Sequence, residues 1–529
     1  MFLIMSAAYV GQELESEFGR LPPSFLPLGN QRLFKHQINS IPENYEIYLS
    51  IPESYDVTEC DIKWLDKHDI HIIKTPDNLT LGASLVAALN LSEQGLDKDL
   101  HILFGDTLIP ELSEFVNFHN DIIGVSTIKE NYNWTELQGN KIQWIDIKND
   151  KLTDKVIVNG YFKISKPRAF VKAITKSHWD FIDGLNLYQN DNNVKEVLVN
   201  KWLDFGHVNT YYQSKSEFTT QRAFNDLSIC QDWIEKSSAK NIKIKAEANW
   251  FKSIPDEMKI FIPQFLGDND TRGEYSYRLE YLYYTALNEL YVFSLLPEIK
   301  WEQIIDSCLS FIKLCRDYNY NGASINSLKN LFGEKTLERV NEFCADKKID
   351  TFTKWNFNGE KISIDDLIYL SNKYLPQDEE ITLLHGDFCF SNILYDFRSQ
   401  RIKVIDPRGI TPSNDFSIYG DYRYDLAKLS HSIIGLYDRI IAGYYSIDIN
   451  YNSHDIQFSL DGERYYLAIQ QIFVDKINKY FNLNEMNLLA MQIHLFISML
   501  PLHADDHLRQ DALFANAFRL YQKMKEFEI

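Results

Sequence analysis

Short apolar runs separated by polar helical stretches dominate roughly the first two hundred residues of the chain. The runs are FLIMSAA at 2–8, YEIYLSI at 45–51, IHIIK at 70–74, HILFGDTL at 101–108 and IIGVSTI at 122–128. Runs this short and apolar are typical of strands that are buried on both faces. Segments between them, such as SLVAALNLSEQ at 84–94, have helical periodicity. The pattern predicts a mostly parallel sheet with helices on both faces.

The pattern changes after about residue 215. Alternating segments at 226–238 and 274–284 predict antiparallel strands. Beyond Leu287 the periodicity is helical, with one strand-rich island at 381–410. We therefore predict two α/β units, 1–217 and 218–529. The second unit should divide into a smaller lobe at about 218–285 and a larger one at about 286–529.

Composition and charge narrow the class of protein. Of the 529 residues, 45% are hydrophobic and 24% charged, as in ordinary globular proteins. With 54 basic and 74 acidic residues the net charge is −20, which argues against nucleic acid as a partner but leaves room for anions in a local basic pocket. Six cysteines without a CxxC pair suit reduced thiols. Without a basic leader or an apolar run of about 18 residues, the chain is expected to be cytoplasmic, with no membrane partner. The oligomeric state is left open.

The segment LLHGDFCFSNILYDFRSQRIKVIDPRG at 383–409 combines three groups suited to phosphoryl transfer. Asp387 lies in an HGD turn, Asn392 follows five residues later, and Asp406 comes after a predicted hairpin with arms ILYD and RIKVID. Because a hairpin returns on itself, Asp406 should lie beside the loop that holds Asp387 and Asn392. In phosphoryl transfer one Asp orients and deprotonates the acceptor hydroxyl, while an Asn and a second Asp hold Mg²⁺ on the nucleotide phosphates.

These motifs resemble the aminoglycoside phosphotransferase and choline kinase family, from about Arg222 to the end of the chain. The resemblance implies a bilobal protein-kinase-like fold that uses ATP and Mg²⁺, with Asp387 as catalytic base and Asn392 and Asp406 as metal ligands. It also implies a lysine on a small-lobe strand that pairs with a glutamate on the next helix. We assign Lys236 and Glu247 to these roles.

Other parts of this family pattern are less distinct. Lys243 and Lys245 are rivals of Lys236. The segment around Glu280 and Leu282 resembles the hinge strand whose backbone meets adenine. Asp425, in GDYRYDLAKLS, resembles the aspartate that braces the active site, although a plain helix cap is an alternative interpretation. No glycine-rich loop precedes Lys236, which argues against a protein kinase.

The first unit resembles the sugar-nucleotide pyrophosphorylases, a Rossmann-like family with the GT-A type of fold. The resemblance rests on the opening segment 1–30, LTLGASLVAALN at 79–90, HILFGDTL at 101–108 and KWLDFGHVNTYYQSK at 201–215. It implies Mg²⁺ held by Asp106 and Asp204, and contact between Gly82 and the nucleotide. VNGYFKIS at 158–165 resembles the segment that contacts the sugar. The Mg²⁺ would align two polyanions when a phosphate attacks a nucleoside triphosphate.

The opening segment departs from this family pattern. Tyr9 follows Ala7 and Ala8 where the family has glycine, and Pro23 stands in place of its lysine. Loss of that lysine removes a charge that would stabilise departing pyrophosphate. Arg20 is the candidate replacement and our second catalytic residue.

Together the two resemblances imply consecutive reactions. ATP would phosphorylate a small hydroxylated compound, and a second nucleotide, CTP or UTP, would then activate the product as a precursor for bacterial surface polysaccharide. Choline, ethanolamine, an alditol and a free sugar all remain open as acceptors. Two alternatives also remain: a kinase with a non-catalytic first unit, and a scaffold of two decayed folds.

Overall fold

The computed structural model describes residues 1–128, 135–138, 141–144, 155–222, 227–229, 232–238, 241–271, 274–320, 328, 330–411 and 414–528. Cys230 and parts of 221–233, where a glycine-rich loop would precede Lys236, lie outside these ranges. The chain divides into two compact units. The first is Met1–Thr219 with Phe293–Leu295, and the second is Thr220–Val292 with Leu296–Ile529.

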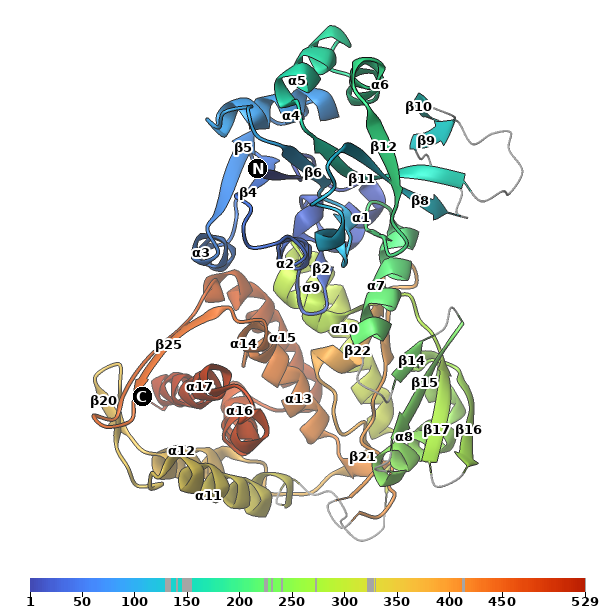
Figure 1. Ribbon diagram of the computed structural model, residues 1–529. Helices are drawn as coiled ribbons and strands as arrows, with labels where there is room; N and C mark the ends of the chain where they lie inside the picture. Colours follow the sequence, from blue (N-terminus) through green and yellow to red (C-terminus); the bar gives the residue numbers. More distant parts are fainter. Residues whose placement is uncertain are drawn as a thin grey trace. The chain divides into compact units, whose positions relative to one another are not determined.

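A nine-stranded mixed sheet forms the centre of the first unit (Figure 1). Its parallel core has the order β5 (Ile70–Thr75), β4 (Ile47–Pro52), β1 (Phe2–Met5) and β6 (Leu100–Phe104). The remaining strands are β11 (Lys155–Ile164), antiparallel to β6, then β8 (Asp121–Ile128), β12 (Val194–Leu198), β9 (Thr135–Gln138) and β10 (Lys141–Trp144). The structure thus confirms the predicted parallel sheet and adds antiparallel strands to it.

The helices of the first unit are α1 (Gln12–Phe18), α2 (Leu33–Asn39), α3 (Glu59–Lys67), α4 (Leu81–Leu91), α5 (Pro167–Lys176), α6 (Phe181–Asp191) and α7 (Val208–Arg222). They bury apolar side chains, and α3, α4 and α6 contact strands of this sheet. Leu85 and Leu89 of α4 belong to one buried core with Leu3 of β1 and Ile102 of β6. Burial at about 25 cal/mol per Å² of apolar surface is what holds these layers together.

The smaller lobe of the second unit is a four-stranded antiparallel sheet with one helix packed on it (Figure 1). The strands, in order across the sheet, are β14 (Leu227–Ile229), β15 (Trp233–Ser238), β17 (Glu274–Glu280) and β16 (Phe265–Thr271). The helix is α8 (Asn241–Ser253). In this sheet Lys236 lies opposite Tyr277, so both side chains project from the same face.

The larger lobe is mainly helical around a small sheet. The predicted hairpin is formed by β22 (Ile393–Asp396) and β23 (Arg401–Val404), with Ile393 opposite Val404. β18 (Thr285–Ala286) pairs with β22 in the same small sheet, whereas β21 (Ile381–Leu383) and β24 (Tyr419–Asp421) form a separate antiparallel pair. The helices of the lobe are α9 (Leu287–Phe293), α10 (Glu298–Arg316), α11 (Lys335–Lys347), α12 (Ile364–Tyr374), α13 (Arg423–Ile433), α14 (Tyr437–Ile441), α15 (Leu467–Phe481), α16 (Glu485–Met499) and α17 (His507–Glu526).

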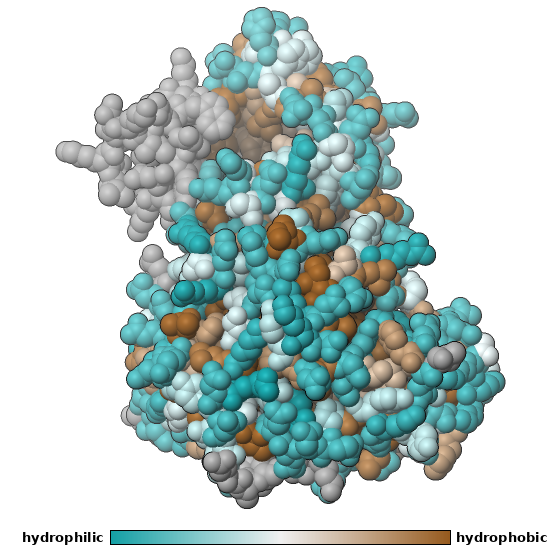
Figure 2. Space-filling model, turned by 180° about the vertical axis from the view of Figure 1, so that it is seen from behind, coloured by the Kyte–Doolittle hydropathy of each residue, from teal (hydrophilic) through white to brown (hydrophobic). Residues whose placement is uncertain are grey.

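The centre of the larger lobe is α16, which packs against α11, α12, α13 and α17. By length and composition the stretch Glu485–His503 could cross a membrane, and within the described ranges it is the one stretch that passes this test. In the structure 67% of it is buried, as expected for the core helix of a globular lobe. The surface is more polar: hydrophilic residues predominate on the face shown in Figure 2.

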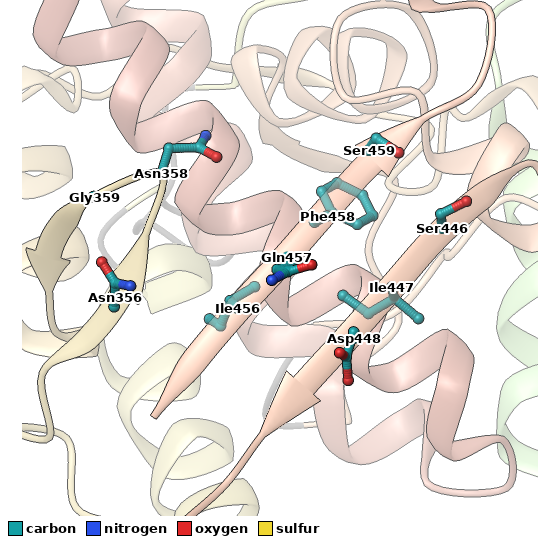
Figure 3. Close-up of a pocket in the computed structure, with 10 residues that line it drawn as sticks. All are labelled: Asn356, Asn358, Gly359, Ser446, Ile447, Asp448, Ile456, Gln457, Phe458 and Ser459. Carbon is teal, nitrogen blue, oxygen red and sulfur yellow. The ribbon is translucent and has the colours of Figure 1, made fainter. Parts of the chain in front are cut away.

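A second sheet in the larger lobe corrects the prediction of a single strand-rich island beyond Leu287. Its order is β20 (Glu360–Ile362), β19 (Trp355–Phe357), β26 (Asp455–Leu460) and β25 (Tyr445–Asn450). Ile456 and Leu460 are buried, whereas Gln457 and Ser459 between them are exposed. A groove of about 550 Å³ lies on this sheet, lined by residues of β19, β25 and β26 (Figure 3). None of these lining residues belongs to the motifs described above.

Candidate functional site

In the second unit, Lys236 lies between two carboxylates. Its Nζ is 2.8 Å from Oε2 of Glu247 on α8 and 3.0 Å from Oδ1 of Asp406. The Tyr277 hydroxyl donates a 2.7 Å hydrogen bond to the same oxygen of Glu247. Burial lowers the pKa of Lys236, but Asp406 and Glu247 outweigh it and hold the pKa above its ordinary value. The lysine is therefore cationic at neutral pH, as phosphate binding requires.

Asp387 and Asn392 meet in the turn that precedes β22. The Asn392 amide Nδ2 donates to the backbone oxygen of Asp387 at 2.9 Å and to its Oδ2 at 3.0 Å. This leaves the amide Oδ1 of Asn392, which accepts a long 3.4 Å bond from Ser391, as the atom suited to a cation. The Ile405 N–H donates to the Asn392 carbonyl at 3.0 Å, which brings Asp406 beside this turn as the hairpin predicts.

Lys428 of α13 contacts the other oxygen of Asp387. Its Nζ is 2.9 Å from Oδ1. Burial would raise the pKa of Asp387, but Lys428 more than offsets it and holds the pKa below its ordinary range. The carboxylate is therefore ionised and can accept a proton from a hydroxyl.

Asp425 braces the HGD turn from α13. Its carboxylate accepts 2.8 Å hydrogen bonds from the backbone N–H groups of His385 and Gly386. Asp425 lies in the first turn of α13, and the residue in the N-cap position is Tyr422, so the capping interpretation is wrong. The Trp250 indole N–H donates to the Leu384 carbonyl at 2.8 Å and ties α8 to the same turn.

The hinge residues end β17 and begin the connection to the larger lobe. The Glu280 N–H donates to Gln264 at 2.9 Å, and the Glu280 side chain lines a cavity of about 500 Å³ together with Lys403. The Tyr281 N–H donates to Asp232. By contrast, no group in the described ranges accepts a hydrogen bond from the Leu282 N–H. The Leu282 N–H is therefore available to donate a hydrogen bond to adenine. Its contact with adenine stays a prediction.

The two rival lysines, Lys243 and Lys245, lie on α8, whereas Lys236 lies on β15. Lys245 pairs with Asp270, 2.8 Å between Nζ and Oδ2, and Lys243 is exposed. Only Lys236 of the three contacts Asp406. Sequence reasoning missed Tyr277 and Lys428. The signals were available, because Tyr277 sits within the predicted strand 274–284 and Lys428 lies three residues after Asp425 on one helix face.

In the first unit, Asp106 and Asp204 face a common point. Asp106 follows β6, and Asp204 lies in β13 (Leu203–Asp204), which pairs with β7 (Thr107–Leu108). The Phe205 N–H donates to the Asp106 carbonyl at 2.8 Å. A Cβ placed on Gly206 would lie 2.9 Å from Oδ2 of Asp106 and 3.4 Å from Oδ1 of Asp204. Glycine therefore keeps open the space between the two carboxylates.

Electrostatics makes this pair a candidate cation site. Burial and then the neighbouring Asp204 raise the pKa of Asp106 to about 7. Two carboxylates this close repel each other unless a proton or a cation lies between them. In the described part of the chain no three acidic, histidine or cysteine side chains converge as a ready-made metal cluster. One or two carboxylates with substrate phosphates are the usual set for Mg²⁺, so both this pair and Asn392 with Asp406 fit that ion.

The other predicted residues of the first unit have internal contacts. The Arg20 guanidinium lies 4.0 Å from the centre of the Tyr9 ring and is exposed. A Cβ on Gly82 would meet the Trp179 carbonyl at 2.4 Å, so close helix packing alone accounts for this glycine. The Asn159 amide donates to Ser126 within the sheet at 3.1 Å. Ligand contact by Arg20, Gly82 and Asn159 stays a prediction.

No protein family and no curated protein sequence matches the chain. Solved structures of two kinds are similar to it. One kind includes the nucleoside-diphosphate-sugar pyrophosphorylase from Vibrio cholerae (16% identity, 41% of this chain and 99% of that chain, TM-score 0.32) and the inositol-1-phosphate CTP transferase from T. maritima (18%, 42% and 97%, 0.33). The other includes a thermostable mutant of aminoglycoside phosphotransferase APH(4)-Ia (13%, 59% and 98%, 0.35). These are the two kinds of protein that the sequence motifs resemble, and at such low identity the similarity concerns the fold alone.

Proposed function

We propose that the second unit transfers the γ-phosphoryl group of ATP to a hydroxyl group of a small molecule. The observation that carries this proposal is that Lys236 joins Glu247 to Asp406 while Asn392 holds Asp387 in the adjoining turn. Together these provide a phosphate-binding cation, a cation site and a base.

The residues divide the reaction between them. Lys236 holds the α- and β-phosphates, and Asp387 orients the acceptor hydroxyl and takes its proton. The acceptor oxygen bonds to the γ-phosphorus, the bond from that phosphorus to the bridging oxygen breaks, and ADP leaves. Asn392 and Asp406 would hold Mg²⁺, which when bound would neutralise charge on the phosphates.

The test is release of ADP from ATP with choline, ethanolamine, alditols and free sugars as acceptors. Asp387→Asn should lower kcat about a hundredfold or more, because it removes the base. Lys236→Met should raise the KM for ATP, whereas Lys243→Met, the same change at an exposed site, should leave it unchanged. Full turnover by Asp387→Asn would overturn the proposal.

We further propose that the first unit joins the phosphorylated product to a nucleotide. The product phosphate attacks the α-phosphorus of CTP or UTP, and pyrophosphate leaves. Asp106 and Asp204 hold Mg²⁺, and Arg20 stabilises the leaving group. The facing carboxylates support this role. The nucleotide-activated compound would serve as a precursor for bacterial surface polysaccharide, a role suggested by the sequence resemblance.

Pyrophosphate release tests this second step. With kinase product and CTP or UTP, Asp204→Asn should abolish pyrophosphate release and leave ADP release unchanged. Kinase activity without any pyrophosphate release would instead favour the alternative that the first unit is non-catalytic. Pro23 in place of the family lysine is the feature that supports that alternative.

A further inference from the structure

Basic side chains gather around the proposed base. Lys428 contacts Asp387 directly. Arg408 packs on the HGD turn, since a Cβ on Gly386 would lie 2.7 Å from the Cβ of Arg408. Lys335 and Arg339 are one turn apart at the start of α11. The charge of Lys335 interacts with those of Arg339, Arg408, Lys428 and Asp387. We call Lys335, Arg339, Arg408 and Lys428 the basic cluster.

Carboxylates do not balance this cluster. Lys428 is paired with Asp387, and the Arg339 guanidinium donates to the Ser498 carbonyl at 3.0 Å. For Lys335, Arg339 and Arg408 the described residues provide no ion pair. Burial first, and then the neighbouring cations, lower the pKa of Lys335 to about 7. In a chain of net charge −20, Arg339 and Arg408 thus carry charges that no carboxylate of the described residues balances, and a bound anion would balance these charges and favour the charged form of Lys335.

The position of the cluster indicates which substrate supplies that anion. Lys236, on a strand of the smaller lobe, and Asp406, which it contacts, are the groups placed for the ATP phosphates. Lys428 instead contacts Asp387, the group proposed to take the proton of the acceptor hydroxyl. We therefore assign Lys428, and the basic side chains whose charges interact with it, to the acceptor.

We propose that the acceptor carries a carboxylate or phosphate group close to the hydroxyl that is phosphorylated, and that the basic cluster binds this group. The inference rests on the proposed kinase function and narrows its substrate to anionic hydroxy compounds. It disfavours choline and ethanolamine, whose positive charge the cluster would repel. The chemical step is unchanged: the hydroxyl proton goes to Asp387, and ADP leaves.

Binding can be measured without knowing the natural acceptor. The probes are matched sets, D-glycerate and glycerol 3-phosphate against glycerol, and D-gluconate against D-glucitol, added to the full chain at constant ionic strength. We expect the acids to raise the midpoint of thermal unfolding and the neutral compounds not to. Comparison of glycerate with glycerol 3-phosphate distinguishes carboxylate from phosphate. The double variant Lys335→Met/Arg339→Met should weaken the binding of acids about tenfold or more, and Lys361→Met, at an exposed lysine of β20, should not.

Three results would overturn the inference. The first is equal binding of acids and neutral compounds, and the second is equal binding of acids by the wild type and the double variant. The third is a double variant whose KM for ATP rises while its preference for acids is retained, which would assign the cluster to ATP. All three differ from failure of the kinase proposal, in which Asp387→Asn would leave ADP release intact.

Discussion

At the scale of single residues, the Lys428–Asp387 pair should set the acid limit of the kinase reaction. Lys428 holds the pKa of Asp387 below its ordinary value against the opposing effect of burial. In Lys428→Met the largest opposition to burial is lost and only His385 and the Asn392 hydrogen bond still oppose it, so the pKa of Asp387 should rise. The acid limb of the kcat/KM profile should then move to higher pH, by on the order of one unit.

Lys428→Arg is the matched control, because it retains the charge beside Asp387. Its acid limb should stay near that of the wild type. A Lys428→Met profile that falls equally at every pH would contradict the prediction. Lys428 would then act on the transferred phosphoryl group and not through Asp387.

The Asp106–Asp204 pair predicts a pH-dependent response to Mg²⁺. With its pKa near 7, Asp106 holds a proton in the folded, metal-free protein at a pH where the unfolded chain has lost it. The folded state then binds more protons, so the free energy of unfolding should fall as pH rises toward and through 7. Mg²⁺ needs both carboxylates ionised, so its stabilising effect should increase over the same range.

Thermal unfolding at pH 6 and pH 8, with and without Mg²⁺, checks this. Asp106→Asn should remove the Mg²⁺ response of the first unit and reduce its pH dependence, to which His207, whose pKa Asp204 raises, also contributes. If Mg²⁺ raised the midpoint of thermal unfolding equally at the two pH values, the prediction that Asp106 holds a proton near pH 7 would be wrong. At this scale sequence reasoning named both aspartates, but their facing geometry depends on the pairing of β13 with β7, which no local pattern records.

At the scale of elements, Gly409 sets the distance between the DPRG loop and α8. Its φ is +61°, and an added Cβ would lie 2.3 Å from the Ala246 carbonyl oxygen, next to Glu247. Gly409→Ala therefore combines a left-handed backbone, which costs about 1 kcal/mol, with a clash against the helix. We expect a loss of stability of roughly 2 kcal/mol or more, with a higher KM for ATP because Glu247 moves.

Gly359→Ala separates the two effects. Gly359 also has a positive φ, +82°, but nothing lies within 4 Å of its added Cβ. It should show only the backbone cost of about 1 kcal/mol in urea unfolding, with an unchanged KM for ATP. If both variants lost the same free energy of unfolding, α8 would have moved away from the added Cβ of Gly409→Ala without disturbing the site.

The sequence predicts an element well when the residues that form it are close together along the chain. The β22–β23 hairpin was predicted because its arms and turn are contiguous, and Asp406 followed from it. The β25–β26 pair was missed although both strands alternate at period two. These short strands lie between helices in a region where helical periodicity dominates, and their partner β19 is about a hundred residues away. The contact between Lys236 and Asp406, 170 positions apart, was not predicted: the family pattern supplied Glu247 as the partner of Lys236, and no local pattern relates Lys236 to Asp406.

At the scale of the whole molecule, the two proposed activities predict that a different nucleotide stabilises each unit. A ligand present at a hundred times its Kd adds about 2.7 kcal/mol to the unit that binds it. With Mg²⁺ present, ATP should stabilise the wild type and should lose this effect in Asp387→Ala/Asp406→Ala. CTP or UTP should stabilise the wild type through the first unit, and this stabilisation should be absent only in Asp106→Ala/Asp204→Ala.

Thermal unfolding with ATP, CTP, UTP, GTP and dTTP gives this pattern directly, and each double variant serves as the control for the other. A second nucleotide whose shift depends on Asp106 and Asp204 would identify the nucleotide of the transfer. If ATP alone stabilises the chain, and only through Asp387 and Asp406, the two-step proposal fails and kinase activity alone remains. Loss of both responses in either double variant would contradict independent sites, because mutations at independent sites should act separately.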